Sequence, residues 1–262
     1  MALDQAHGII LKSQKFRESS KILRVFTEEY GTISLIAKGV RGPKSKTAGL
    51  TEVLNHVVVS FYRKPGQDLY LLKQVDIQDA FSGLRAVYEG LTVALAVTEV
   101  VYRITIQEAA HAELFADLLQ ALQSLDAGAK RPLNYYWAFL LSVQHTFGCG
   151  MTVDQCSVSG QALPEGSAAF HLDYGGTIDA ENSDAATADA RISPESRWVI
   201  HYLQNNTGDR LDRLAPSEPC RKEINTLLHR YMRYHIEGFS EPQSLKLLTT
   251  NRPDPTATTR SL

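Results

Sequence analysis

Four cationic side chains and no acidic one occur in the ten-residue stretch AKGVRGPKSK, residues 37–46. The four are Lys38, Arg41, Lys44 and Lys46. Gly39, Gly42 and Pro43 are unfavourable inside a helix or strand, so we predict that the stretch is a loop. A cationic loop is often only a solvated surface, but four unopposed positive charges also suit a polyanion such as the phosphate backbone of a nucleic acid.

This loop does not have the pattern of a nucleotide-binding phosphate loop. The spacing G-x-x-x-x-G-K-[ST] is absent, and Pro43 lacks an amide N–H that such a loop needs. Elsewhere the eight histidines form no H-E-x-x-H motif, no G-x-S-x-G motif occurs, and no cysteine has a catalytic signature beside it. We therefore predict no catalytic residue, no cofactor and no enzyme activity.

The N-terminal region holds further residues that could contact nucleic acid. Five more cations lie in or between the first two predicted strands: Lys12, Lys15, Arg17, Lys21 and Arg24. Five aromatic residues could stack on bases: Phe16, Tyr30, Phe61, Tyr62 and Tyr70. Cations with aromatic rings are typical of surfaces that bind single-stranded nucleic acid, although we expect about three of the five rings to fill the core instead. So many cations cannot all be buried, and they form the predicted DNA-binding surface.

The charge of the chain is unevenly distributed. All 262 residues together carry a formal net charge of −2, but residues 1–80 hold twelve Lys and Arg against eight Asp and Glu, a net charge of +4. The remaining residues hold fifteen Lys and Arg against twenty-one Asp and Glu, a net charge of −6.

Three cysteines are too few for a disulfide framework, and the first ten residues do not resemble a signal peptide. We expect a cytoplasmic, nucleoid-associated protein.

Short strands fill the first 80 residues. Alternating apolar residues bounded by turn sequences predict strands over residues 7–16, 21–29, 31–38, 55–64 and 68–77. Five strands with a cationic loop between the third and the fourth predict a small closed barrel such as an OB-fold. The fold class is α+β, with residues 1–80 as an OB-fold DNA-binding domain.

Helical spacing replaces the strand pattern after Phe81. Residues 81–250 are predicted to be an α-helical domain, interrupted at about 148–192 by a loop-rich acidic insertion. The run LTVALAVTEVVYRI from Leu91 contains Glu99 and Arg103, so it is a buried helix rather than a membrane span. Later helices are expected after Ser193 and from about Ser217, the last one ending near Gly238. We expect the tail, residues 251–262, to be disordered.

Several segments together resemble one family. The run KFRESSKILRVFTEEYGTISLIAKGVRGPKSK is similar to the N-terminal signature of the RecO family of recombination mediators, and the similarity continues through TEVLNHVVVSFYRK. The segments GCGMTVDQCSVSG, FHLDYGG and SLKLL follow in the order of that family. The resemblance covers nearly the whole chain.

The resemblance implies a function without catalysis. Members of this family bind single- and double-stranded DNA, anneal complementary strands, and help RecA displace single-strand-binding protein together with RecR. The resemblance leaves open whether this protein also uses a RecF-like partner. No membrane is expected to be involved. A rival interpretation of the same residues is a scaffold or transcriptional regulator that uses the barrel to bind duplex DNA or protein only.

One family feature is missing here. In many members of the family, the corresponding segments contain a pair of C-x-x-C motifs, whose four cysteines make a zinc site. In this chain Cys156 remains, while Ser159, Asp179 and Asn182 stand at the other three positions. We therefore expect no bound metal.

The resemblance also implies that the helical domain binds the acidic C-terminal tail of single-strand-binding protein. Such a tail ends in an apolar residue and needs a cation beside an apolar groove. The candidates from this sequence are Arg103, Arg131, Arg210, Arg213, Arg221 and Lys222. Surface cations are more often solubility groups or members of intrachain ion pairs, so the set is a hypothesis.

Overall fold

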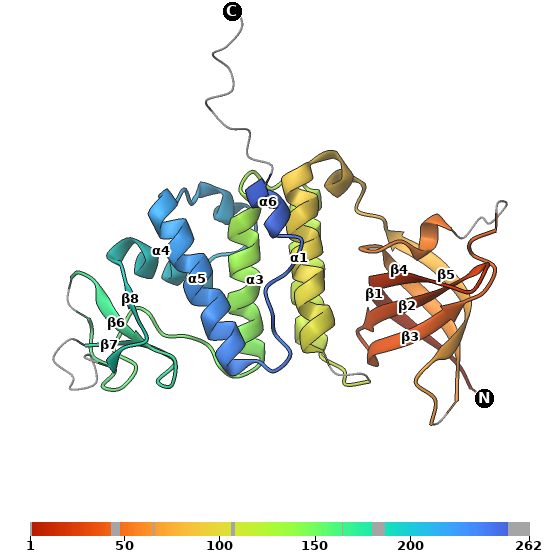
Figure 1. Ribbon diagram of the computed structural model, residues 1–262, viewed down its shortest axis with the longest axis horizontal. Helices are drawn as coiled ribbons and strands as arrows, with labels where there is room; N and C mark the ends of the chain where they lie inside the picture. Colours follow the sequence, from red (N-terminus) through yellow and green to blue (C-terminus); the bar gives the residue numbers. More distant parts are fainter. Residues whose placement is uncertain are drawn as a thin grey trace, which may run out of the picture.

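The structure is a computed structural model that describes residues 2–42, 48–64, 66–105, 108–163, 165–179 and 187–250. Figure 1 shows a strand barrel at one end, a group of helices in the middle and a small sheet at the other end. The α+β class predicted from the sequence is confirmed. The expectation of a disordered tail falls on residues 251–262, which lie outside the described residues.

Five strands form the barrel in the closed order β1-β2-β3-β5-β4. They are β1 (Ala2–Phe16), β2 (Ser20–Thr27), β3 (Gly31–Ala37), β4 (His56–Arg63) and β5 (Tyr70–Asp79). All pairings are antiparallel except β3 with β5, which closes the barrel through only two parallel pairs, Leu35 with Tyr70 and Ile36 with Leu71. This strand order is that of the predicted OB-fold.

Alternation along each strand separates the barrel core from its outer surface. On β4 the side chains of Val57, Val59 and Phe61 are buried in the core, while His56 and Tyr62 point outward. On the side that faces the helices, outward residues of the barrel are also buried: Ile9, Leu11, Phe26 and Leu54 belong to the core of the helical part. The barrel is therefore packed firmly onto the helices.

Close backbone contact reinforces this junction. Gly31 has a φ of 68°, and a Cβ atom at this position would collide with the carbonyl group of Ala109. The amide of Glu108 donates to the oxygen of Thr32 at 3.2 Å, and the hydroxyls of Thr32 and Thr105 lie 2.8 Å apart. Only glycine fits at position 31, because any side chain would push the barrel away from the segment before α2.

The middle of the molecule contains the helices α1 (Tyr88–Ile104), α2 (Ala112–Asp126), α3 (Pro132–Thr146), α4 (Pro194–Gln204), α5 (Glu218–His235) and α6 (Lys246–Thr250). Short 3-10 turns are η1 (Gly49–Thr51), η2 (Ser82–Ala86) and η4 (Gly208–Arg213). The predicted N-cap Ser193 is confirmed, since its side chain accepts a bond from the amide of Ser196. Ser217, near the predicted start of the last helix, caps α5 in the same way by accepting from the amide of Cys220. No described helix is long and apolar enough to cross a bilayer.

The predicted acidic insertion contains more regular structure than the sequence indicated. Three short strands, β6 (Ala168–His171), β7 (Gly176–Ile178) and β8 (Ala190–Ile192), form an antiparallel sheet in the order β7-β6-β8. Strands of three or four residues are too short to show an alternating pattern. The sheet packs on α5, where the ring of Phe170 lies 5.9 Å from that of Tyr231. The division of the chain at residue 80 remains a prediction.

Candidate nucleic-acid interface

Four of the predicted DNA-binding cations gather at one end of the barrel. The segment after β3 folds back onto the turn between β1 and β2: the amide of Arg41 donates to the oxygen of Ser19, and its guanidinium donates to the oxygen of Arg17, both at 3.0 Å. The strand register places Lys15 beside Lys21, and Lys21 beside Ala37, which directly precedes Lys38. We call Lys15, Arg17, Lys38 and Arg41 the barrel-end cluster.

The barrel-end cluster is exposed and positively charged. All four residues are exposed, and none forms an ion pair with an acid of the described part of the chain. The guanidinium of Arg17 lies 5.2 Å from the centre of the Phe16 ring. A polyanion that approaches this end would therefore meet four hydrated charges that form no ion pair with an acid of the described residues.

Lys21 differs from its neighbours. Its side chain is only 14% exposed, and its ammonium group lies 2.9 Å from Glu52 and 3.2 Å from the hydroxyl of Thr51. Lys21 thus connects β2 to η1 across the end of the barrel. Because Glu52 neutralises its charge, Lys21 contributes less positive potential than the four exposed cations.

Lys12 and Arg24 lie opposite each other in the pairing of β1 and β2, close to the helices. The ammonium of Lys12 lies 5.1 Å from the centre of the Tyr102 ring on α1. Arg24 donates to the hydroxyl of Ser34 at 2.5 Å. The two remaining predicted cations, Lys44 and Lys46, lie outside the described residues.

The five aromatic candidates divide between core and surface. Phe61 and Tyr70 are buried, and Tyr30 is partly buried against the barrel core, so two of the expected three rings fill the core and a third packs on it. Phe16 and Tyr62 remain partly exposed. Each of these two rings has a cation beside it, Arg17 for Phe16 and Lys73 at 6.0 Å for Tyr62.

Lys73 was missed from the sequence for a structural reason. The register between β4 and β5 shifts at Phe61, which pairs with Leu72, whereas Ser60 pairs with Gln74. Lys73 is the extra residue of this bulge, and the bulge turns its side chain toward Tyr62. A second missed cation, Arg63, lies 5.1 Å from the Tyr30 ring, but it also forms an ion pair with Glu108 at 3.5 Å.

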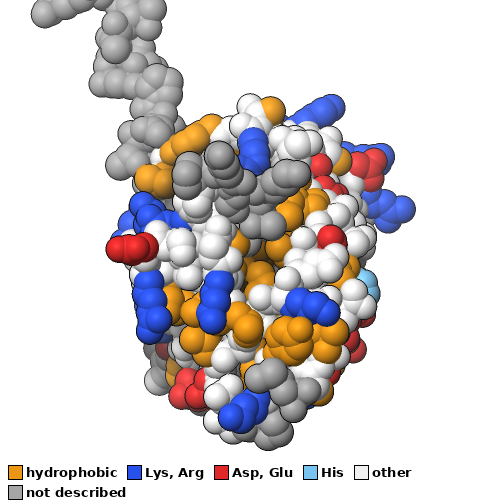
Figure 2. All heavy atoms as spheres, turned by 90° about the vertical axis from the view of Figure 1, so that its right-hand side faces the viewer, with side chains coloured by type: hydrophobic (Ala, Val, Ile, Leu, Met, Phe, Trp, Pro, Cys, Tyr) orange, Lys and Arg blue, Asp and Glu red, His pale blue; other side chains and the backbone are white. Residues whose placement is uncertain are grey.

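An apolar row crosses the outside of the barrel between these cations. Neighbouring strands pair Leu3 with Tyr62, Tyr62 with Leu71, Leu71 with Ile36, and Ile36 with Ile22. All five side chains are partly or fully exposed. Figure 2 shows hydrophobic side chains across the middle of this end of the molecule, with Lys and Arg side chains around them. Apolar surface flanked by positive charge is suited to unpaired bases and their phosphates.

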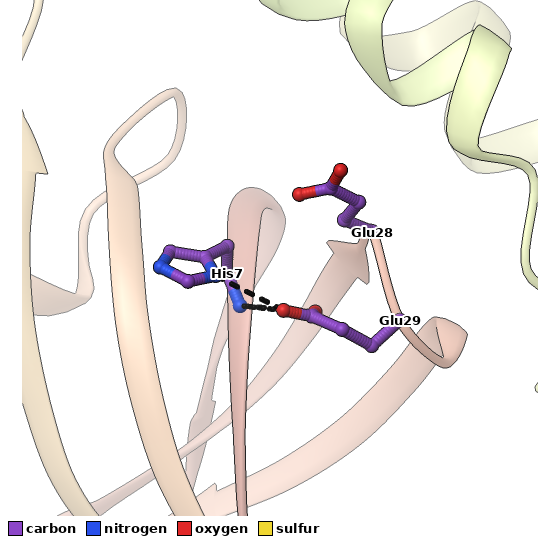
Figure 3. Close-up of side chains that lie close together, drawn as sticks. All are labelled: His7, Glu28 and Glu29. Atoms are coloured by element: carbon purple, nitrogen blue, oxygen red, sulfur yellow. Dashed lines mark hydrogen bonds and ion pairs between the residues drawn. The ribbon is translucent and has the colours of Figure 1, made fainter.

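The described residues contain one cluster whose atoms could share a metal ion: His7, Glu28 and Glu29, with ligand atoms within 4.8 Å of one another. Figure 3 shows the Glu29 carboxylate directed at His7, whose amide and Nδ1 lie 3.1 and 3.0 Å from it. The Glu28 carboxylate takes part in neither contact. All three side chains are exposed, and the contacts hold the turn between β2 and β3 against β1.

The zinc-site positions of the family carry different chemistry here. Burial by itself would raise the pKa of the Cys156 thiol, but hydrogen bonds from the Ser159 hydroxyl and from the amides of Ser159, Asp179 and Val158 lower it to about 7. Asn182 lies outside the described residues. A single thiol does not supply the four ligands of a tetrahedral zinc site, which is the reason for expecting no zinc. That expectation stays a prediction.

The predicted tail-binding cations lie in different places. Arg221 and Lys222 line a groove of about 500 Å³ between α5 and the segment that leads into α6. Its apolar walls are Leu133, Pro242, Leu245 and Leu248, and Lys246 adds a cation that was missed from the sequence. We call this the α5 groove. Arg221 and Lys222 both lie close to Glu218, at 3.6 and 3.7 Å.

The other four candidates do not join this groove. Arg103 donates to Ser240 and to the oxygen of Glu241, and lies 3.5 Å from Glu99, so it joins α1 to the segment after α5. Arg131, Arg210 and Arg213 are exposed and line no described part of the groove. The structure thus brings Arg221 and Lys222 together with Lys246 in one groove, and the role of all six predicted tail-binding cations stays a prediction.

Comparison with known proteins bears on both parts of the chain. The family model described as "Recombination protein O N terminal" matches residues 1–81, and the one described as "Recombination protein O C terminal" matches residues 85–244. The DNA repair protein RecO of Prosthecochloris aestuarii is 29% identical over 97% of this chain and 100% of its own length. The protein of the same name from an Anaeromyxobacter species is 31% identical over 73% of both chains, and that of Desulforamulus reducens is 27% identical over 90% of this chain and 91% of its own.

Proposed function

The chain belongs to the RecO family, and from this premise we propose that it acts in DNA repair by recombination as a DNA-binding protein that catalyses no reaction. In finer terms, it binds single- and double-stranded DNA, anneals complementary strands, and promotes loading of RecA onto DNA covered by single-strand-binding protein. RecR is its partner in this loading. It works in the cytoplasm at the nucleoid.

The observation that carries this proposal is the barrel-end cluster. Four cations from two separate segments, the end of β1 with the turn that follows it and the segment after β3, are brought together by the bonds of Arg41 to Ser19 and Arg17. Each exposed cation that contacts a phosphate releases a counterion, so four contacts predict strong binding that falls with salt. These contacts carry no base information, which suits a protein that must act on any sequence.

Annealing follows from the same charges. Two DNA strands repel each other through their phosphates, and a surface that neutralises part of that charge lets them approach within pairing distance. The apolar row from Leu3 to Ile22 offers exposed surface to unpaired bases before they pair. No bond is made or broken, so no catalytic group is required.

The α5 groove is our candidate for the tail of single-strand-binding protein. An acidic tail with an apolar end fits a site in which Arg221, Lys222 and Lys246 lie beside apolar walls. The guanidinium of Arg221 lies 3.6 Å from Glu218 and the ammonium of Lys222 lies 3.7 Å from it, so an acidic tail would compete with Glu218 for these two cations. The helical part has a net negative charge, so the attraction must be local rather than general.

Strand annealing tests the function against its rival. Complementary oligonucleotides covered by single-strand-binding protein are mixed with and without this protein, and duplex formation is followed by fluorescence energy transfer. A mediator accelerates the reaction, whereas a scaffold or a regulator that binds duplex DNA leaves its rate unchanged. Incubation of labelled DNA with divalent metal is the parallel test for nuclease activity, and intact DNA is the expected result.

A further inference from the structure

The two tryptophans of the chain have opposite environments. Trp137 is fully buried in the helical core, whereas Trp198 on α4 is 58% exposed. The ring of Tyr202, one helical turn further along α4, lies 5.4 Å from the Trp198 ring and supports one side of it. A large, exposed and supported indole is typical of the residues that dominate protein interfaces.

A groove of about 540 Å³ lies beside Trp198, between α4 and the segment that precedes β6. Val153, Leu163 and Pro194 form its apolar walls. The guanidinium of Arg197 fastens the two sides together, since it donates to the oxygens of Val153 at 3.1 Å and Gly166 at 3.3 Å. This groove, which we call the Trp198 groove, is therefore shaped by fixed contacts.

Two carboxylates are exposed at the Trp198 groove. Asp154 and Glu165 line it, and both are exposed. Arg197 lines the groove as well and keeps its charge, but its guanidinium is directed at the two backbone oxygens; His201 lies 3.9 Å from Asp154. The surrounding stretch 154–195 carries eight acids and a single cation, Arg191. The two exposed carboxylates can therefore accept hydrogen bonds from a cationic group that enters the groove.

An indole face with carboxylates at its edge is the chemistry that recognises a guanidinium. The cation lies flat on the aromatic ring, while its N–H groups donate to the carboxylates. We propose that the Trp198 groove binds an arginine-bearing segment of a partner protein. The arginine stacks on Trp198 and pairs with Asp154 or Glu165, and apolar residues beside it pack on Val153, Leu163 and Pro194.

The position of this site gives it a distinct role. Figure 1 shows α4 and the small sheet at the end of the molecule away from the barrel. A partner held at the Trp198 groove would leave the barrel-end cluster open to DNA, so one molecule could bind both at once. This inference does not depend on the DNA-binding proposal, because it rests on residues of the helical part only.

Fluorescence provides a direct test, because Trp198 is the exposed one of the two tryptophans. The full chain is titrated with the blocked peptide Ac-Gly-Leu-Arg-Leu-Gly-NH2 and with the same peptide carrying citrulline, which has the shape of arginine but no charge. We expect saturable protection of Trp198 from iodide quenching with the arginine peptide, and binding about tenfold weaker or more with citrulline. A lysine peptide should bind several-fold less tightly than the arginine peptide, since an ammonium stacks less well.

Variants test whether the peptide binds in the Trp198 groove itself. Asp154→Asn with Glu165→Gln should weaken the arginine peptide about fivefold or more, and Trp198→Ala should abolish its binding when measured by calorimetry. Replacing the barrel-end cluster by glutamine should leave peptide binding unchanged. Equal binding of arginine and citrulline peptides, absence of saturable binding up to about 5 mM, or competition by a single-stranded oligonucleotide for Trp198 would each overturn the proposal.

Discussion

The barrel-end cluster and the α5 groove both present lysine and arginine, but they hold these residues in different surroundings. At the barrel end the cations are exposed, have no ion pair with a described acid, and lie at the end of β1 or in the segments that follow β1 and β3. In the α5 groove Arg221 and Lys222 lie near Glu218, and apolar side chains stand beside them. The first arrangement suits a long polyanion of any sequence, and the second suits a short acidic segment with an apolar end.

The difference shows why a count of charges does not locate a binding site. Residues 1–80 carry a net charge of +4 and the rest of the chain −6, yet both regions hold candidate sites for anions. What separates them is whether acids of the protein already neutralise the cations, and whether apolar surface lies within reach. Experiments that alter one region and measure both ligands test this comparison.

The largest expected effect comes from the barrel end. Replacing Lys15, Arg17, Lys38 and Arg41 by glutamine should reduce the slope of log affinity against log salt for single-stranded DNA by about 3 units, at roughly 0.7 per phosphate contact. The measurement is fluorescence anisotropy with a labelled oligonucleotide over a range of salt. Lys130, Arg131, Arg210 and Arg213 replaced together form a control with the same change of charge. An equal loss in the control would refute the barrel-end assignment.

The cationic loop of residues 37–46 can also be tested by itself. Replacing Lys38, Arg41, Lys44 and Lys46 should flatten the salt slope by about 3 units if each contacts one phosphate. Comparison of the two quadruple variants then shows whether Lys15 and Arg17 act with the loop. A loop variant with unchanged slope and affinity would show that the loop is only a solvated surface.

The next effect concerns the α5 groove. Lys222→Glu with Lys246→Glu should weaken a fluorescent peptide of the single-strand-binding protein tail about tenfold or more, because two attractive charges become repulsive. Both residues are exposed, so the fold should be retained. DNA affinity should stay the same. If the barrel-end variant loses the peptide and this variant retains it, the tail binds at the barrel.

A smaller effect separates Lys21 from Lys15, its register neighbour. Lys15→Gln should reduce the salt slope by about 0.7, whereas Lys21→Gln should change it little, because Glu52 already neutralises Lys21. Loss of that ion pair should lower the free energy of unfolding by less than about 1 kcal/mol, since Glu52 is half-exposed. Equal slopes for the two variants would show that neutralisation by Glu52 is unimportant.

A separate effect, on stability and not on binding, belongs to Cys156 in the helical part. Its folded pKa of about 7 is below its ordinary value of 9, so the thiolate adds stability that is present above pH 9 and is lost as pH falls to 7. The native protein should therefore gain stability relative to Cys156→Ala between pH 7 and 9. Cys149→Ala is the control, because burial raises the pKa of Cys149. Denaturant unfolding at several pH values provides the measurement.

Elemental analysis accompanies that experiment. The purified protein should contain no stoichiometric zinc, because Ser159, Asp179 and Asn182 replace the other three cysteines of the family pattern. Close to one zinc per chain would contradict this expectation. It would also require ligands other than those of the family pattern.

Much of the architecture is predictable because it depends on local patterns. Alternating apolar residues mark the five barrel strands, and the N-cap residues Ser193 and Ser217 mark the starts of α4 and α5. The sequence predicts the end of α5 near Gly238, but the helix stops at His235. Gly238 serves a contact instead, because a Cβ atom there would lie 2.5 Å from the oxygen of Arg103. That contact joins residues far apart in sequence and leaves no local pattern.

The sequence by itself determined the fold class, the basic N-terminal part and the resemblance to the RecO family, because each depends on residue order or composition. Only the tertiary structure decided which cations lie together. It paired Lys21 with Glu52, brought Arg41 onto the turn of Arg17, and turned Lys73 toward Tyr62 through a bulge. It also placed Trp198 at the surface and Trp137 in the core. Pairing, exposure and register depend on which segments meet in space, and the order of residues along the chain does not state that.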